Sequence, residues 1–169
     1  MGLDMYLYKT KRVNGLSAED YLKVDNAVFD AKGDLDIEAV TGVSGLQDAI
    51  IEAGKNFHWH SILTEIGYWR KANAIHNWFV NNVQGGEDNC QLYEVGKDQL
   101  LVLQNIVNHV LESELLAEEL LPTVSGFFFG GTCYDDYYRE DLENTIDILD
   151  NVLNSTDFND EIVFYRSSW

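Results

Sequence analysis

Proline occurs once in this chain of 169 residues, and cysteine and methionine occur twice each. Because proline is so scarce, no proline-rich linker divides the chain, which is long enough to form one domain with its own core. Cys90 and Cys133 are too few for a disulfide framework, and we expect two buried thiols. Apolar runs are short, as in Phe127–Phe129, so no segment is expected to span a membrane.

Basic residues are also scarce: the chain has 11 Lys and Arg residues and 29 Asp and Glu residues, which gives a net charge of −18. Direct binding of nucleic acid is therefore not expected, because the side chains that neutralise phosphates are missing. Such a charge keeps a protein soluble and favours association with basic surfaces. The acidic surface either serves solubility alone or lets the protein occupy a basic, nucleic-acid-binding groove by imitating its charge.

Familiar catalytic patterns are absent as well. The chain has no Cys-x-x-Cys, no nucleophile elbow, no P-loop and no Gly-x-Gly-x-x-Gly. His58 and His60 share one face of an expected strand, but two ligands do not make a metal site. The sequence therefore specifies no catalytic residue, metal or cofactor, and it favours a role other than an enzyme. The N-terminus lacks the features of a signal peptide, which favours the cytoplasm.

Hydrophobic periodicity predicts an α+β fold, with a mostly antiparallel sheet and three main amphipathic helices on one face. Ser17 and Asp20 form a capping box for a helix over about 18–31, and a second short helix is expected over about 45–53. The main helices are expected over about 69–83, 97–112 and from Asp135 onward, the last with a stripe of Tyr138, Leu142, Thr145, Leu149 and Val152. Strands are expected at 2–8, 55–64, 90–95, 125–131 and 161–166.

The stretch Glu65–Val80, EIGYWRKANAIHNWFV, is dense in hydrogen-bond donors. On a helix, its polar side chains would line a pocket in which Arg and Lys hold a phosphate or carboxylate and His76 acts as acid or base. In the alternative, His76 is a core histidine and the cations pair with acidic side chains; the apolar neighbours of His76 favour that alternative. The candidate binding residues are Tyr68, Arg70, Lys71, Asn73, His76 and Tyr138.

A second candidate is the loop after the three phenylalanines. Gly130 and Gly131 would let backbone N–H groups approach a phosphate. Asp135 and Asp136 oppose this, because carboxylates repel phosphate, and they are better explained as caps of the following helix. Thr132 competes with Asp135 for the cap position. We therefore favour a structural role for this loop.

Four segments carry a resemblance to a known family: MGLDMYL at 1–7, EIGYWRKANAIHNWFV at 65–80, LPTVSGFFFGGT at 121–132 and YRSSW at 165–169. Together they resemble small accessory proteins of bacteriophages and prophages, over residues 1–8 and about 63–169. The resemblance implies a protein acting in the cytoplasm of a bacterial host cell, and it implies no particular activity. Residues 9–62 are individual to this chain, so we interpret them as a variable insertion in a single domain, 1–169.

Three functions remain open from the sequence. The favoured one is a phage-encoded acidic protein that binds the basic surface of a host or defence protein. One way for it to act is to inhibit a nucleic-acid-binding machine by occupying its basic groove. The second is a protein, or an enzyme, that binds a nucleotide or phosphorylated small molecule at Tyr68–Asn73 and His76. The third is a structural domain that forms a homodimer through Phe127–Phe129. None of the three involves a membrane.

Overall fold

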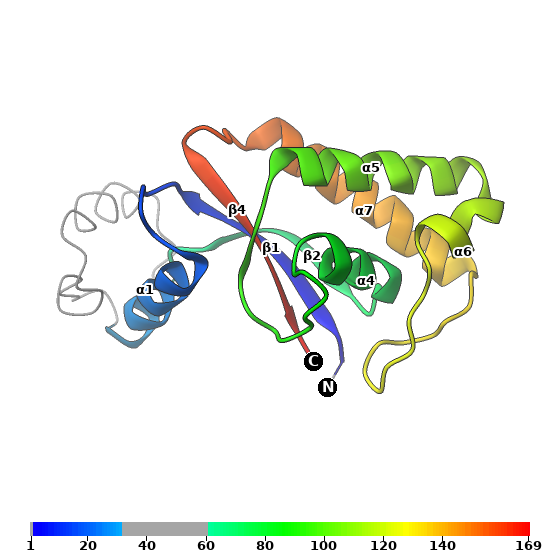
Figure 1. The fold of residues 1–169 in the computed structure, drawn as a ribbon, viewed down its shortest axis with the longest axis horizontal. Helices are drawn as coiled ribbons and strands as arrows, with labels where there is room; N and C mark the ends of the chain where they lie inside the picture. Colours follow the sequence, from blue (N-terminus) through cyan, green and yellow to red (C-terminus); the bar gives the residue numbers. More distant parts are fainter. Residues whose placement is uncertain (1, 32–60) are drawn as a thin grey trace.

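The computed structural model describes residues 2–31 and 61–169, and it has the expected α+β fold (Figure 1). The strands are β1 (Asp4–Lys11), β2 (Thr64–Arg70), β3 (Tyr93–Val95) and β4 (Glu161–Ser168). The helices are α1 (Ala18–Ala31), α4 (Asn73–Asn82), α5 (Lys97–Glu112), the 3₁₀ turn η1 (Glu114–Leu116), α6 (Ala117–Leu120) and α7 (Asp136–Ser155).

The strands form one antiparallel sheet in the order β2-β1-β4-β3. The first and last strands of the chain are therefore neighbours, with Leu7 opposite Tyr165. Side chains alternate between the two faces of a strand, and Met5 and Leu7 are fully buried on one face while Tyr6 and Tyr8 point to the other. The expected strand at 2–8 is thus present, but it begins at Asp4 and extends to Lys11.

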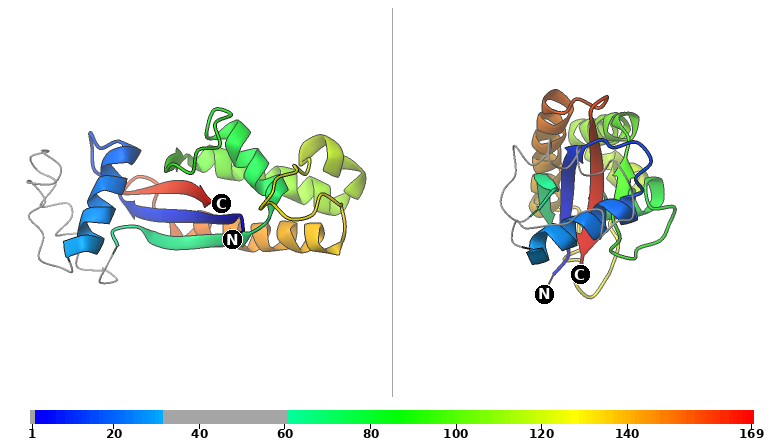
Figure 2. Two further views of the ribbon diagram at one scale, coloured as in Figure 1. Left: turned by 90° about the horizontal axis from the view of Figure 1, so that it is seen from below. Right: turned by 90° about the vertical axis from the view of Figure 1, so that its left-hand side faces the viewer.

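Helices α4, α5 and α7 pack on the face that carries Met5 and Leu7, as the sequence predicts. Helices α5 and α7 lie side by side, and α7 also packs against β2 (Figures 1 and 2). The expected apolar stripe of α7, from Tyr138 to Val152, is buried along its whole length. Burial of each large apolar side chain contributes roughly 1.5–3 kcal/mol, so these stripes hold the helical layer in place.

Helix α1 lies against the opposite face, at one end of the sheet (Figure 2). The rings of Tyr21 and Phe164 are 5.1 Å apart, and the Tyr21 hydroxyl donates to the carbonyl of Lys11. The capping box is confirmed, because Asp20 accepts from the backbone N–H of Ser17 and donates its own N–H to the Ser17 hydroxyl. The expected helix at 45–53, nearly all of the strand at 55–64, and His58 and His60 lie outside the described residues.

The interpretation of 69–83 as one helix is wrong. Residues 64–70 form β2, and the helix begins only at Asn73. Between them Lys71 has a φ of 63°, a left-handed conformation that neither a strand nor a right-handed helix contains. Trp69 belongs to the sheet: it lies opposite Met5, and its indole N–H donates to Thr145 on α7. Within Glu65–Val80, the spacing of the apolar residues therefore changes from the 2-residue period of a strand to the 3.6-residue period of a helix.

The prediction of a strand at 125–131 is also wrong, since this segment is an irregular loop. Phe127 is 96% exposed, whereas Phe129 packs edge-on against His76. A turn closes from the Phe129 N–H to the Gly126 carbonyl, and Gly130 has a φ of 89°. Aromatic residues favour strands only when neighbouring strands pair with them, and here a single backbone bond, Leu3 to Phe128, joins the loop to the N-terminal segment.

Both cysteines are free thiols, as expected, but they are not both buried: Cys90 is half-buried and Cys133 is exposed. Among the residues that the structure describes, no helix is both long and apolar enough to cross a membrane.

Candidate functional site

A pocket of about 330 Å³ lies where β2 turns into α4. Its walls come from three parts of the chain: the segment from Arg70 to Ile75, the loop with Gly130 and Gly131, and the beginning of α7. The volume is at the lower end of the range of small-molecule sites, roughly 300–1,000 Å³. The two candidate regions of the sequence, the Arg-Lys stretch and the Gly-Gly loop, thus line the same pocket.

Arg70 and Lys71 provide the cationic wall. Both are exposed, and within residues 2–31 and 61–169 neither side chain forms an ion pair or a hydrogen bond. Asp4 is opposite Arg70 in the strand register, but its carboxylate accepts a hydrogen bond of 2.5 Å from the Tyr68 hydroxyl. Two unpaired cations side by side are unexpected in a protein with a net charge of −18.

The backbone at Lys71 is held in an unfavourable conformation. A left-handed conformation costs a residue with a side chain about 1 kcal/mol or more, and such strain gathers at functional sites. Gly130 lies directly against this turn, since a Cβ atom there would be 3.2 Å from the Lys71 Cβ. The absence of a side chain at Gly130, together with its positive φ, lets the loop close over the turn.

Asn73, the first residue of α4, joins this turn to the loop. Its side-chain amide donates to the carbonyls of Phe129 and Gly131 at 3.1 and 2.7 Å, and its oxygen accepts from the Val124 N–H at 3.0 Å. Asn73 is 5% exposed, and these bonds use both N–H donors of its amide. Asn73 therefore shapes the pocket and has no donor left for an anion.

The first turn of α4 also faces the pocket. Ala72 occupies the cap position, and no side chain caps the helix. The Asn73 N–H donates to the Lys71 carbonyl at 2.8 Å, whereas the N–H groups of Ala74 and Ile75 have no acceptor within the helix and are available to an anion. Ala74 and Ile75 line the pocket together with Arg70 and Lys71.

The part of the pocket that comes from the beginning of α7 carries three carboxylates, Asp135, Glu140 and Asp141. Of the two competing caps in the sequence, Thr132 and Asp135, the N-cap is Asp135, whose side chain accepts from the Tyr138 N–H. Burial, and then the charges of Glu140 and Asp135, raise the pKa of Asp141 to about 6. The Asp141 carboxylate receives no hydrogen bond from any residue the structure describes.

Tyr138 provides an aromatic side of the pocket. It is 9% exposed, and its hydroxyl donates to the Leu121 carbonyl at 3.0 Å. Burial raises the pKa of this hydroxyl well above its ordinary value, so it stays protonated. Like Asn73, Tyr138 builds the pocket with bonds to the protein.

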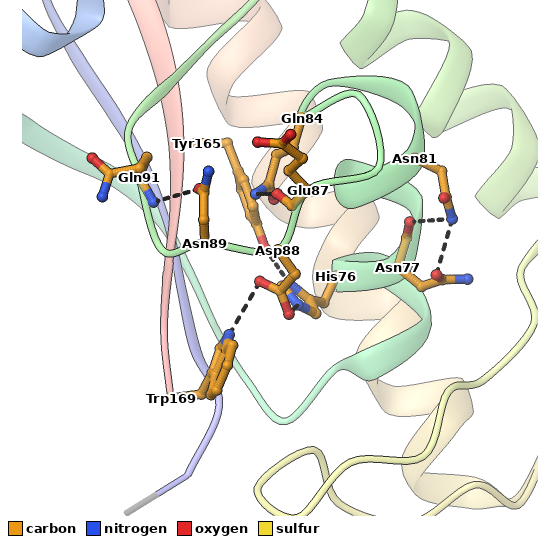
Figure 3. Close-up of polar contacts among 10 residues, drawn as sticks. All are labelled: His76, Asn77, Asn81, Gln84, Glu87, Asp88, Asn89, Gln91, Tyr165 and Trp169. Carbon is orange, nitrogen blue, oxygen red and sulfur yellow. Dashed lines mark hydrogen bonds and ion pairs between the residues drawn. The ribbon is translucent and has the colours of Figure 1, made fainter.

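His76 lies one turn further along α4, in a different environment (Figure 3). Its Nε2 is 3.0 Å from Asp88 and its Nδ1 is 2.7 Å from the Tyr165 hydroxyl. A carboxylate only accepts, so Nε2 carries the proton and the Tyr165 hydroxyl donates to Nδ1. Both ring nitrogens have a hydrogen-bond partner, and the residue is 1% exposed.

This network connects distant parts of the chain. The indole of Trp169 donates to the second oxygen of Asp88 at 3.1 Å, so the C-terminus, the loop after α4 and α4 itself meet at one carboxylate (Figure 3). Burial raises the pKa of Tyr165 well above its ordinary value. His76 therefore has the contacts of a core histidine and does not line the pocket.

Tyr68 is on the other face of the sheet, where its ring lies 5.3 Å from that of Tyr6. Its exposed fraction is 40%, and it does not line the pocket, although Arg70 lies on the same face of β2. Of the six residues selected from the sequence, the structure brings together Arg70, Lys71, Asn73 and Tyr138, and it places Tyr68 and His76 elsewhere.

The sequence did not single out Asp141, Cys133 or Thr123, which also line the pocket. A signal for Asp141 exists: it is an acid directly before Leu142 in the buried stripe of α7, with no basic residue three or four positions away. Cys133 and Thr123 lie in loops without regular periodicity, and no pattern marks them.

Within the described part of the chain, no group of three or more His, Cys, Asp or Glu side chains is arranged to hold a metal ion. Segments that are far apart in the chain meet beside the pocket: Lys71 donates its N–H to the Leu3 carbonyl, and Phe129 packs against Trp169. No protein-family model, curated protein or solved structure matches this chain.

Proposed function

We propose that this protein binds a small anionic molecule, with a phosphate or carboxylate group held by Arg70, Lys71 and the first turn of α4. The observation that carries the proposal is the pair of unpaired cations at a pocket of about 330 Å³. Every other arginine of the described chain, Arg12, Arg139 and Arg166, has a partner within the protein. The charges and hydrogen-bond donors of Arg70 and Lys71 are therefore available to a ligand.

The arrangement suits an anion on physical grounds. The planar guanidinium of Arg70 can donate two parallel hydrogen bonds to one phosphate or carboxylate, and Lys71 adds a compact positive charge. The free N–H groups of α4 add partial positive charge at the same place.

Thermal unfolding with candidate ligands tests this proposal. Inorganic phosphate, acetate and a panel of nucleotides are added to the wild type, to Arg70→Ala and to Lys71→Ala. A ligand that binds only the folded state at 100 times its Kd stabilises that state by about 2.7 kcal/mol, which raises the Tm. Lys23→Ala is the matched control, because Lys23 is an exposed cation on α1 whose ion pair among the described residues is with Glu19. If no anion raises the Tm of the wild type, the proposal fails.

A second candidate is the acidic binding protein suggested by the resemblance to phage and prophage proteins. Residues 97–155 contain twelve Asp and Glu residues but only Lys97 and Arg139 as basic residues. Along α7 the exposed acids form a continuous series: Asp136, Glu140, Glu143, Asp147 and Asp150. This surface favours a host or defence protein with a basic groove as partner.

Capture of partners from a bacterial lysate tests the second candidate. We expect a basic protein that is retained at low salt and released at high salt, because screening weakens contacts between exposed charges. A variant with Asp136→Asn, Glu143→Gln and Asp147→Asn should retain less of it. Equal capture by this variant and the wild type contradicts the candidate.

A further inference from the structure

Asp141 has an environment that the fold alone does not explain. Its carboxylate is half-buried, lies near two other carboxylates, and forms neither a hydrogen bond nor an ion pair with the described residues. Partial burial of an unpaired charge costs free energy, so a carboxylate in such a place normally has a partner. Asp141 is among the residues that line the pocket, so a ligand bound there can reach it.

Helix capping does not explain this carboxylate. Helix α7 begins at Asp136, and its N-cap is Asp135. Asp141 is the sixth residue of the helix, beyond the first turn in which the helix dipole stabilises a negative charge. Arg139, the only basic side chain of α7, pairs with Glu114 and Glu143 and not with Asp141.

The pocket therefore has two charged walls. Arg70, Lys71 and the N-terminus of α4 form a positive wall, and Asp141 with Asp135 and Glu140 forms a negative wall on α7. No ion pair joins the two walls. A ligand with an anion at one end and N–H donors at the other would satisfy both.

We infer that the pocket takes a dipolar ligand, whose phosphate or carboxylate binds Arg70 and Lys71 and whose N–H donor group binds Asp141; this inference rests on the proposed function. Two kinds of compound supply such a donor. One is an amine, as in a phosphorylated amino alcohol or an amino acid, and the other is the N1–H and N2–H edge of guanine, which donates two hydrogen bonds to a carboxylate. In both, Asp141 determines specificity and Arg70 and Lys71 hold the anion.

The experiment compares ligands in pairs that differ only in the donor end. Phosphoethanolamine is compared with ethyl phosphate, β-alanine with propionate, and guanosine monophosphate with inosine monophosphate, which lacks the N2 donor. Binding is followed by protection of Cys133 from alkylation, since this exposed thiol lines the pocket, and Cys90 serves as the internal control. The proteins are the wild type, Asp141→Asn and Asp147→Asn, an exposed acid of the same helix used as control.

The expected result is that the dipolar member of at least one pair binds the wild type and Asp147→Asn at least tenfold more tightly than its partner. The amine pairs and the guanine pair then distinguish the two sources of the donor. In Asp141→Asn the difference within that pair should fall below about threefold, while the affinity for inorganic phosphate does not fall, because the variant removes a negative charge from the pocket.

Two results overturn the inference while the proposed function stands. One is binding of phosphate at Arg70 and Lys71 with no preference for the dipolar member of any pair. The other is a preference that persists unchanged in Asp141→Asn. If Arg70→Ala and Lys71→Ala leave the affinity for every anion unchanged, the proposed function itself fails.

Discussion

His76 in the first turn of α4 and the Arg70–Lys71 pair just before this helix differ in one property, the number of hydrogen bonds that their side chains can still form. His76 is 1% exposed and both of its ring nitrogens are bonded within the protein. Arg70 and Lys71, a few residues earlier, are exposed and unpaired. The comparison teaches that residue type is a weak guide to function: the histidine has the chemistry of an active site but supports the core, whereas the two cations are free to bind.

The largest effect on stability is expected at His76. In His76→Ala the Tyr165 hydroxyl and Asp88 lose their shared partner, and a cavity forms next to Phe129. We expect the free energy of unfolding to fall by about 3–4 kcal/mol, measured by urea denaturation. Tyr165→Phe removes one hydrogen bond and keeps the aromatic ring, so it should lower the free energy of unfolding by about 1–2 kcal/mol. A loss under 1 kcal/mol for His76→Ala would show that the network does not support the core.

Asn73 is expected to have the next largest effect. Asn73→Ala leaves two carbonyls and the Val124 N–H of the 123–131 loop without their partner. The expected loss is about 2–3 kcal/mol, together with faster hydrogen exchange at Val124. Asn81→Ala is a suitable control, because Asn81 is an exposed residue on the same helix. Unchanged exchange at Val124 would contradict the role of Asn73 in holding the loop.

Replacement of Asp141 should raise the free energy of unfolding, and the gain should depend on pH. Its pKa is raised from the ordinary 3.8 to about 6, so the folded protein binds this proton more tightly than the unfolded chain. Stability from this group is therefore full below about pH 4 and is lost as pH rises through about 6. Asp141→Asn should be more stable than the wild type by about 1–2 kcal/mol at pH 7, after allowance for partial solvent exposure, and equal to it near pH 4.

Unfolding curves of the wild type and Asp141→Asn between pH 4 and 7 measure this difference. A gain in stability on removal of a pocket residue is the pattern expected of a site that sacrifices stability for function. A variant less stable than the wild type at pH 7 would show that the Asp141 carboxylate has a stabilising partner.

The smallest effect on stability is expected at Arg70. Arg70→Ala removes an exposed side chain without a partner, so the free energy of unfolding should change by no more than about 0.5 kcal/mol. Denaturation by urea checks this value. A loss above 1 kcal/mol would reveal a structural role for the guanidinium and would weaken the contrast with His76.

The sequence allowed correct prediction of the elements whose apolar residues follow one period throughout. Helices α5 and α7 match their expected stripes because one face of each is buried along its length. Prediction failed where the period changes at Lys71, since a left-handed lysine has no sequence signature. It failed again at Phe127–Phe129, because the strand propensity of the aromatic residues was not matched by a pairing strand.

The candidate site could be predicted only in part from the sequence, for a similar reason. Arg70, Lys71 and Asn73 are close in sequence and could be selected together. That they share a pocket with Gly130 and Asp141 depends on the turn at Lys71 and on the bonds of Asn73, which are tertiary contacts. His76 was selected by its chemistry, and the distant residue that satisfies it, Tyr165, is brought near only by the fold.

The most direct test of the central claim is a titration of the wild type and the double variant Arg70→Ala/Lys71→Ala with the anion that binds the wild type most tightly. We predict that the variant loses at least 30-fold in affinity while its Tm without ligand stays within about 3 °C of the wild type. Equal affinity in the two proteins would contradict the claim that the unpaired cations of this pocket form the binding site.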